Sequence, residues 1–139
     1  MMTPSVEWID QVALRVTSSY ETFAQQLQES DPRLSWVVSS YRTPAFPLRV
    51  FLSLRTGQEP EAEDVVVCLE CVNQPAGVAV QIDVCRDGGD LLDEGQEMAV
   101  SEVGPDSLDL VSAGVDAFLR DASAAVLGYL QEPSRSSAA

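Results

Sequence analysis

Cys68 and Cys71 are separated by two residues, a spacing that metal-binding and redox-active thiol pairs use. Both lie in the apolar run 65–72, which has the β-branched content of a strand. On a strand, residues three apart point to opposite faces, so these thiols could not share a site. Matching the apolar faces of the next hairpin puts Cys71 in the core. It also sets Cys85 opposite Asp64, about 13 Å along the strand from Cys68. We therefore expect three structural thiols, neither bridged nor bound to metal.

The sequence contains no histidine, and all eight of its basic residues are arginine. Without His it lacks the usual general base, zinc ligand and triad partner. Without Lys it cannot form a Schiff base or the phosphate clamp of a P-loop. The composition therefore favours a non-catalytic protein with no catalytic residue, no metal site and no cofactor. Arginine in place of lysine is also typical of a GC-rich bacterial genome.

A second group that could do chemistry is the acidic stretch after Cys85. Clustered carboxylates can hold Ca²⁺, but an EF-hand needs acids at every second position before its glycine. Here the acids come mostly at every third residue, so a solvated hairpin loop over 86–95 is the better interpretation. The acids are Asp87, Asp90, Asp93, Glu94 and Glu97. Glu70 and Asp83 form a further possible carboxylate pair, on the outer face of the predicted sheet.

The net charge is −14, from 22 acidic residues and 8 arginines. Nucleic acids and anionic membranes repel such a domain, so we expect neither as a partner. A basic protein or peptide would be attracted. The alternative is that the acidity only keeps the protein soluble.

The charge is unevenly distributed along the chain. Residues 32–58 hold four arginines and no acid, which is +4, whereas the rest holds four arginines and 22 acids, which is −18. Arginine with aromatic residues is the composition of a binding patch. Either this stretch holds a partner's carboxylate or polar backbone, or its arginines pair with the protein's own acids, such as Glu70 and Asp83. The predicted ligand-binding residues are Trp36, Tyr41, Arg42, Arg49, Phe51 and Arg55.

The elements that must position these residues follow from apolar periodicity. A 3-4 spacing from Val6 to Leu27 predicts a helix over 5–29, with Thr3 as N-cap and Pro4 in the first turn. A similar stripe predicts a helix over 107–131 with Asp106 as N-cap. Between them, alternation and turn residues predict strands near 35–41, 48–55, 65–72, 78–85 and 96–103.

This order predicts an α+β fold: an N-terminal helix, a four- to five-stranded antiparallel sheet and a C-terminal helix. One domain is expected over 1–132, with a disordered tail at 133–139. The start of the chain lacks a signal-peptide pattern and no apolar run is long enough to span a membrane, which favours a cytoplasmic protein. The unbroken seam of the first helix and the second sheet face, with Phe51, Val66 and Cys68, predict a homodimer.

Small size, acidity and the helix–sheet–helix order resemble the type III secretion chaperone and YbjN-like group of peptide-binding domains. The resemblance covers about 130 residues and involves no specific motif. It implies a dimer that holds extended segments of a partner. The chain departs from the chaperones in having no middle helix between its third and fourth strands, so no functional residue is carried over.

Two functions follow from these features. The first is a non-catalytic module that binds a peptide or protein, either chaperone-like or as an immunity or inhibitor protein. The second is a tailoring enzyme of peptide natural-product biosynthesis that acts by preorganising its substrate, since orientation alone can lower a barrier by several kcal/mol.

Overall fold

The structure is a computed structural model that describes residues 6–56, 65–75, 77–86, 91–100 and 104–131. It confirms the α+β fold: one helix, a five-stranded antiparallel sheet and a second helix. The predicted tail at 133–139 lies outside the described residues. The elements in chain order are α1 (Val6–Ser30), β1 (Ser35–Tyr41), β2 (Leu48–Arg55), β3 (Val65–Gln74), β4 (Gly77–Arg86), β5 (Leu91–Val100) and α2 (Pro105–Leu130).

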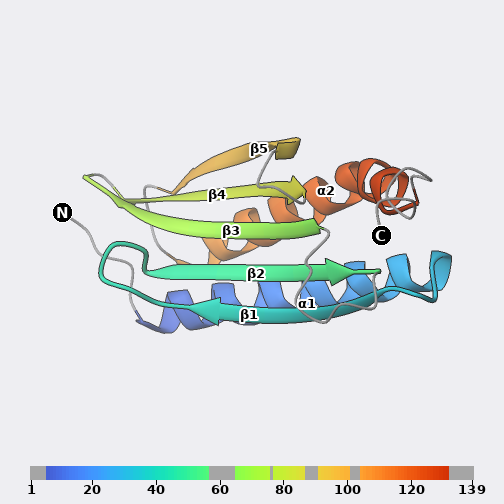
Figure 1. The fold of residues 1–139 in the computed structure, drawn as a ribbon. Helices are drawn as coiled ribbons and strands as arrows, with labels where there is room; N and C mark the ends of the chain where they lie inside the picture. The colour runs from blue at the N-terminus through green and yellow to red at the C-terminus, as the bar shows by residue number, and fades with distance from the viewer. Residues whose placement is uncertain (1–5, 57–64, 76, 87–90, 101–103, 132–139) are drawn as a thin grey trace.

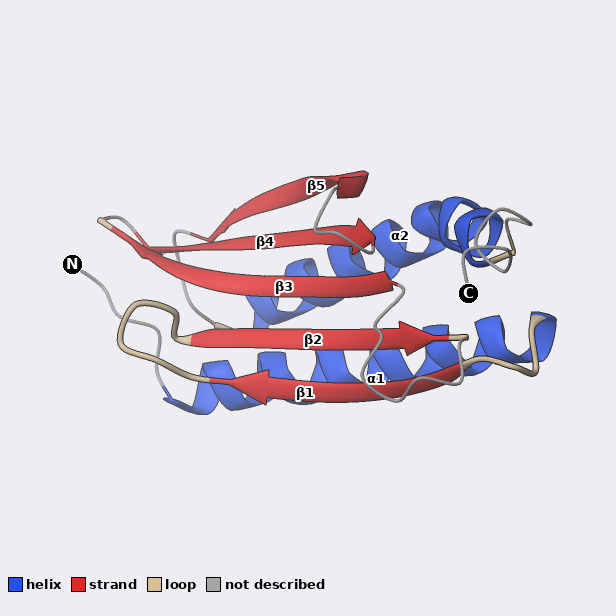
Figure 2. Cartoon of the chain, viewed as in Figure 1, coloured by secondary structure: helices blue, strands red, loops and turns tan. Residues whose placement is uncertain are grey.

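The sheet is a simple meander in which each strand pairs with its neighbours in the chain. Both helices pack on the same face of the sheet, α1 behind β1 and β2 and α2 behind β4 (Figures 1 and 2). The two helices run in the same direction, because side-chain contacts made further along α1 are also made further along α2. The Trp8 indole N–H donates to the Ser107 hydroxyl, and Ser19 donates to Asp116. The described residues therefore form two layers, with both helices on one face of the sheet and neither on the other.

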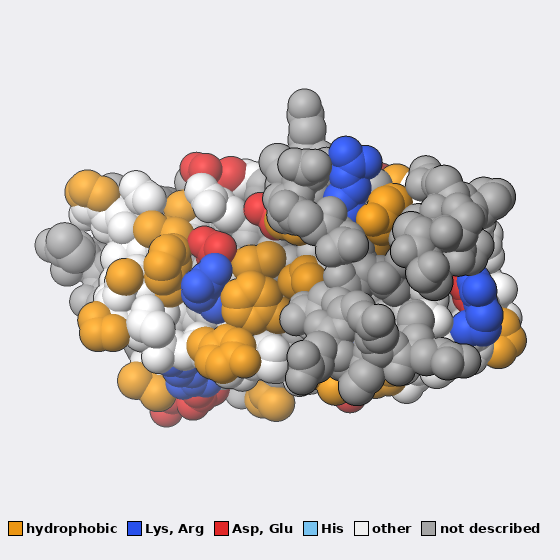
Figure 3. Space-filling model, viewed as in Figure 1, with side chains coloured by type: hydrophobic (Ala, Val, Ile, Leu, Met, Phe, Trp, Pro, Cys, Tyr) orange, Lys and Arg blue, Asp and Glu red, His pale blue; other side chains and the backbone are white. Residues whose placement is uncertain are grey.

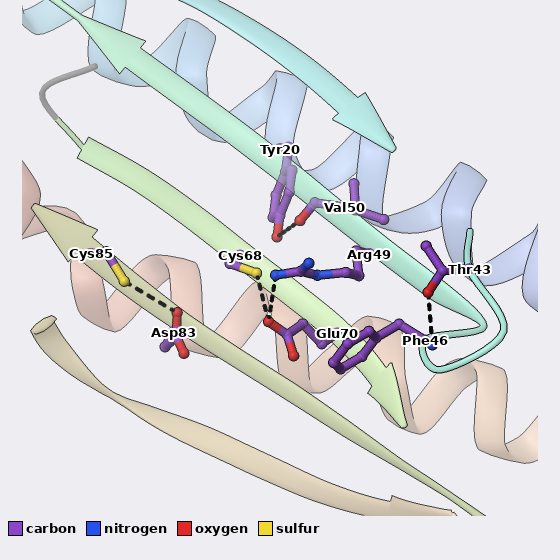
Figure 4. Close-up of polar contacts among 9 residues, drawn as sticks. All are labelled: Tyr20, Thr43, Phe46, Arg49, Val50, Cys68, Glu70, Asp83 and Cys85. Atoms are coloured by element: carbon purple, nitrogen blue, oxygen red, sulfur yellow. Dashed lines mark hydrogen bonds and ion pairs between the residues drawn. The ribbon is translucent and has the colours of Figure 1, made fainter. Parts of the chain in front are cut away.

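α1 is helical because its apolar residues repeat with the helical period and face the sheet. Its buried residues include Val12, Val16 and Tyr20. The Tyr20 hydroxyl donates to the Val50 carbonyl over 3.2 Å, which ties the helix to β2 (Figure 4). Burial is the main cause that raises the Tyr20 pKa well above its ordinary value. The proposed caps Thr3 and Pro4 lie outside the described residues.

α1 ends where Asp31 begins a turn. The Asp31 carboxylate accepts three hydrogen bonds from Arg33: one from its backbone N–H and two from its guanidinium. These bonds lower the Asp31 pKa, the side-chain bond being the largest cause. The next backbone N–H, of Leu34, donates to the Asp31 carbonyl. The turn thus directs the chain from the helix into β1.

α2 begins two residues earlier than predicted. The N-cap is Gly104 rather than Asp106, and Pro105 occupies the first turn, where its missing N–H costs nothing. The Ser107 hydroxyl accepts from the Gly104 N–H and donates to its carbonyl. Further along, a Cβ on Gly114 would collide with the Met98 sulfur of β5. Glycine at this position therefore allows α2 to approach the sheet closely.

The β3–β4 hairpin is tighter than predicted. The two strands pair as far as Gln74 and Gly77, and Gly77 has a φ of 137°, a conformation that favours glycine. As a result the register is shifted by two residues, and Cys85 pairs with Val66 rather than with Asp64. Cys85 therefore lies about 7 Å along the strand from the level of Cys68, not about 13 Å as expected. All three cysteines remain free thiols.

β5 differs most from the prediction. It covers Leu91–Val100, whereas a strand over 96–103 and a loop over 86–95 were expected. Residues 87–90 and 101–103 lie outside the described residues. Asp93 pairs with Val84, so an acidic stretch has become an edge strand because β4 supplies backbone partners for it. Glu97 accepts a hydrogen bond from Gln81 on the neighbouring strand.

The core lies between the sheet and the two helices. It joins the inward residues of β2, β3 and β4 to Val16 of α1 and Val115 of α2, all fully buried or nearly so. Cys71 is part of it, as predicted from the alternation of β3. Within the described residues, neither helix is long and apolar enough to cross a lipid bilayer.

Candidate functional site: the outer face of the sheet

The residues on the outer face of the sheet, opposite the two described helices, follow from alternation along β2. Leu48, Val50, Leu52 and Leu54 are buried towards the helices. Arg49, Phe51, Ser53 and Arg55 therefore share the opposite face, as predicted. Figure 3 looks onto this outer face and shows apolar side chains gathered over β1–β3 beside a basic group.

Two aromatic rings lie against the Arg49 guanidinium on the outer face, and a third ring contacts one of them. The guanidinium carbon lies 4.9 Å from the ring centre of Phe46 and 5.0 Å from that of Phe51, which is cation–π distance. Tyr41 meets Phe51 edge to face, with ring centres 5.8 Å apart. We call Tyr41, Phe46, Arg49 and Phe51 the aromatic cluster. It contains four residues of the Arg-rich segment that the sequence singled out.

The loop between β1 and β2 positions Phe46. The Thr43 N–H donates to the Phe46 carbonyl, and the Thr43 hydroxyl accepts from the Phe46 N–H (Figure 4). This closed turn carries Phe46 over the guanidinium of Arg49. Phe46 was not among the predicted binding residues. The signal was present in the sequence, as a Thr-Pro pair and a second proline that bracket a single aromatic residue.

Glu70 engages the cation of the cluster. Arg49 Nη2 donates to Glu70 Oε1 over 3.1 Å, and both side chains are about one-third exposed or less. The Cys68 thiol donates to the same oxygen over 3.5 Å (Figure 4). The second possibility foreseen from the sequence, pairing with the protein's own acids, therefore holds for Arg49.

The carboxylate pair expected on this face lies on adjacent strands. Cys68 is opposite Asp83, and the Cys85 thiol is 3.8 Å from Asp83 Oδ1. Burial and then the Glu70 charge raise the Asp83 pKa. Burial and the nearby carboxylates also raise the Cys68 pKa to about 12 and the Cys85 pKa in the same direction. These thiols stay protonated near neutral pH, so they are poor nucleophiles.

A hollow of about 280 Å³ lies beside the aromatic cluster on the outer face. Two small residues, Ser39 and Ser53, form part of its lining, between larger side chains. We call it the outer hollow. It is lined by Ser39, Tyr41, Phe51, Ser53 and Val66.

Two predicted binding residues do not join this face. Trp36 pairs with the buried Leu54, so it lies on the helix side of β1 and packs against the core. Arg42 turns towards α1, where its Nη2 lies 2.7 Å from Asp10 Oδ1. Alternation could have placed Trp36, because it is out of phase with Tyr41 on the same strand.

Trp36 instead lines a second hollow, of about 410 Å³, between α1 and β1. We call it the edge hollow. Five consecutive residues of β1 contribute to it, so it follows the edge of the strand. Its lining is Thr17 and Glu21 of α1 with Trp36, Val37, Val38, Ser39 and Ser40 of β1.

Arg55 lies on the outer face but at the other end of β2. It is six positions along the strand from Arg49, about 20 Å at the usual strand rise. The two arginines share the outer face, as predicted, but they lie too far apart for both to bind the same carboxylate. Arg33, also in the Arg-rich segment, is bound to Asp31. The segment thus contains one cluster rather than a continuous basic patch.

No protein-family model matches the chain, and neither a curated protein nor a solved structure does.

Proposed function

We propose that the protein is a non-catalytic binding module whose outer sheet face holds a peptide or protein partner. The observation that supports this most is the outer hollow, which the aromatic side chains of Tyr41 and Phe51 line on the sheet face opposite the two described helices. Aromatic residues around a small depression are the usual anchor points of protein interfaces. A partner would insert an apolar side chain against Phe51 and Val66.

The charges nearby favour a cationic group on the partner. Arg49 is already engaged by Glu70, so it offers little to an incoming carboxylate. Burial and the Glu70 charge raise the Asp83 pKa, because both disfavour the ionised carboxylate. A cation on the partner would stabilise that carboxylate. With a net charge of −14, the whole molecule also attracts basic partners. This differs from the carboxylate ligand expected from the sequence.

Selection from a displayed random-peptide library tests the proposal. Peptides enriched on the wild-type protein would be measured by calorimetry against Phe51→Ala and against Leu110→Ala, an exposed apolar residue of α2. We expect Phe51→Ala to weaken binding about tenfold or more, with Leu110→Ala unchanged. Equal affinity for all three proteins, or no enrichment, would contradict the proposal. A mass change in the bound peptide would instead indicate the tailoring enzyme.

We further propose that the protein works in the cytoplasm as a homodimer, as the group of peptide-binding domains it resembles does. The exposed apolar residues Val6 and Leu14 of α1 support a contact between the helix layers of two copies. Light scattering at micromolar concentration should give twice the 15.0 kDa chain mass. A monomer mass would contradict this assembly without affecting the outer-face proposal.

A further inference from the structure

The two edges of the sheet differ in how they resist pairing with another strand. β5 carries three acidic residues, and its register with β4 shifts at two places. Charged residues and bulges are the devices by which natural proteins block unwanted strand addition. β5 is therefore protected.

β1 has none of these devices. Its sequence, Ser-Trp-Val-Val-Ser-Ser-Tyr, contains no charge, no proline and no glycine. All seven of its residues pair with β2 in an unbroken register. Val37 and Tyr41 are 55% and 57% exposed. In the described part of the chain, β1 pairs only with β2, so its second edge is open to another strand.

The two hollows lie on opposite sides of the position that an added strand would occupy beside β1. The edge hollow follows β1 on the side of α1, and the outer hollow opens on the opposite face. Ser39 contributes to both. Because side chains of a strand alternate between faces, a strand beside β1 would direct one set towards α1 and the other towards the outer face.

The acidic residues of α1 beside β1 indicate which side chains an added strand would contain. Glu21 lines the edge hollow and has no cationic partner among the described residues. Asp10, on the same side of α1, is already paired with Arg42. A second copy of β1 would bring no cation to Glu21, since Ser35–Tyr41 is uncharged. A basic segment of another polypeptide would bring a cation to Glu21.

We propose that the partner adds a sixth strand to the free edge of β1, through an extended segment in which basic and apolar residues alternate. The basic side chains face Glu21 in the edge hollow, and the apolar side chains face the outer hollow beside Tyr41. Backbone hydrogen bonds supply affinity that does not depend on sequence, and the hollows supply specificity. This inference rests on the proposed function and names its partner class.

The test uses a fluorescent eight-residue peptide of alternating arginine and valine, measured by anisotropy. Its counterpart has glutamate in place of arginine. Two further peptides carry N-methyl groups on the amides of every arginine or of every valine. Only one set of amides can face β1, so one N-methylated peptide should lose binding about tenfold or more and the other should keep it.

Charge reversal supplies the matched pair of variants. Glu21→Lys should weaken binding of the basic peptide about tenfold and improve binding of the acidic one. Glu29→Lys makes the same change on an exposed residue of α1 that does not line the edge hollow, and should leave the affinity within about twofold of wild type. Circular dichroism confirms that both variants are folded.

Three results would overturn strand addition. One is that the basic peptide does not bind; another is that both N-methylated peptides bind as well as the parent. The third is that Val37→Lys converts a wild-type dimer to a monomer while the peptide fails to compete, since a second copy would then occupy the edge. If Phe51→Ala still weakens the library-selected peptides, the outer-face function stands while strand addition fails.

Discussion

Arg49 of β2 lies directly opposite Glu70 of β3, and its guanidinium donates to the Glu70 carboxylate over 3.1 Å. Phe46 and Phe51 lie within 5.0 Å of the same guanidinium. The composition of its segment predicts that Arg49 binds a ligand, whereas in the structure Arg49 forms an ion pair with a glutamate of the same protein. Its contribution to stability can be measured separately from any role in binding.

Replacing Arg49 by Ala should destabilise the protein by about 1–2 kcal/mol, because the ion pair and the contacts with two rings are lost together. Arg49→Lys should recover part of this, since it keeps the charge but not the planar group. Urea unfolding measures both, with Arg120→Ala on the exposed side of α2 as control. A loss for Arg49→Ala no larger than the control's would show that the cluster adds no stability.

Asp83 should make the protein less stable as the pH rises. Its pKa is raised in the folded state, mainly by burial, so folding favours the protonated form. The associated stability is present below the ordinary value of 3.8 and is lost as the pH rises through the folded pKa. Asp83→Asn should therefore melt at a higher temperature than wild type at pH 7 and at the same temperature near pH 3. A lower melting temperature at pH 7 would contradict the burial argument.

Asp31 should show the opposite dependence, because three hydrogen bonds from Arg33 lower its pKa. Its contribution is present above the ordinary value of 3.8 and is lost as the pH falls through the lower, folded pKa. Asp31→Asn should cost about 1 kcal/mol at pH 7, since Arg33 is largely exposed, and less in acid. Asp121→Asn, an exposed change in α2, controls for loss of one charge. A pH-independent cost would locate the effect outside the carboxylate.

Two glycines of α2 make a matched pair. Nothing lies within 4 Å of a Cβ built on Gly128, whereas one on Gly114 meets the Met98 sulfur. Gly128→Ala should stabilise the protein by about 0.5–1 kcal/mol through helix propensity. Gly114→Ala should lose that gain or be destabilising, because Met98 must move. Thermal unfolding compares them, and equal gains would mean that Met98 adapts without cost.

Helix and strand positions were largely predictable from the chain itself. The apolar period of α1 and the alternation of β2 follow from which residues can be buried on one face, and this needs no knowledge of neighbours. The bounds of β1 and β2 agree with their predictions, residue for residue. The burial of Cys71 followed from the same alternation.

β5 was predicted wrongly because its residues are poor strand formers. Acidic residues and a glycine over 91–97 indicate a loop when the chain is considered alone. The partner strand β4 changes this balance by satisfying the backbone of Leu91–Val100, and edge strands tolerate polar residues. The two-residue error in the β3–β4 register has a similar cause, since the length of the turn is set by the backbone conformation of Gly77.

The sequence by itself determined the fold class, the faces of the strands and the segment in which aromatic residues and arginines gather. These depend on the order of apolar and polar residues, which short-range geometry converts directly into faces. Only the tertiary structure decided which charges meet. Arg49 reaches Glu70 across a strand pair, whereas Arg42 reaches Asp10 on a helix more than thirty residues away. Composition cannot distinguish these outcomes, because an ion pair depends on distances of a few ångströms between residues that the fold alone brings together.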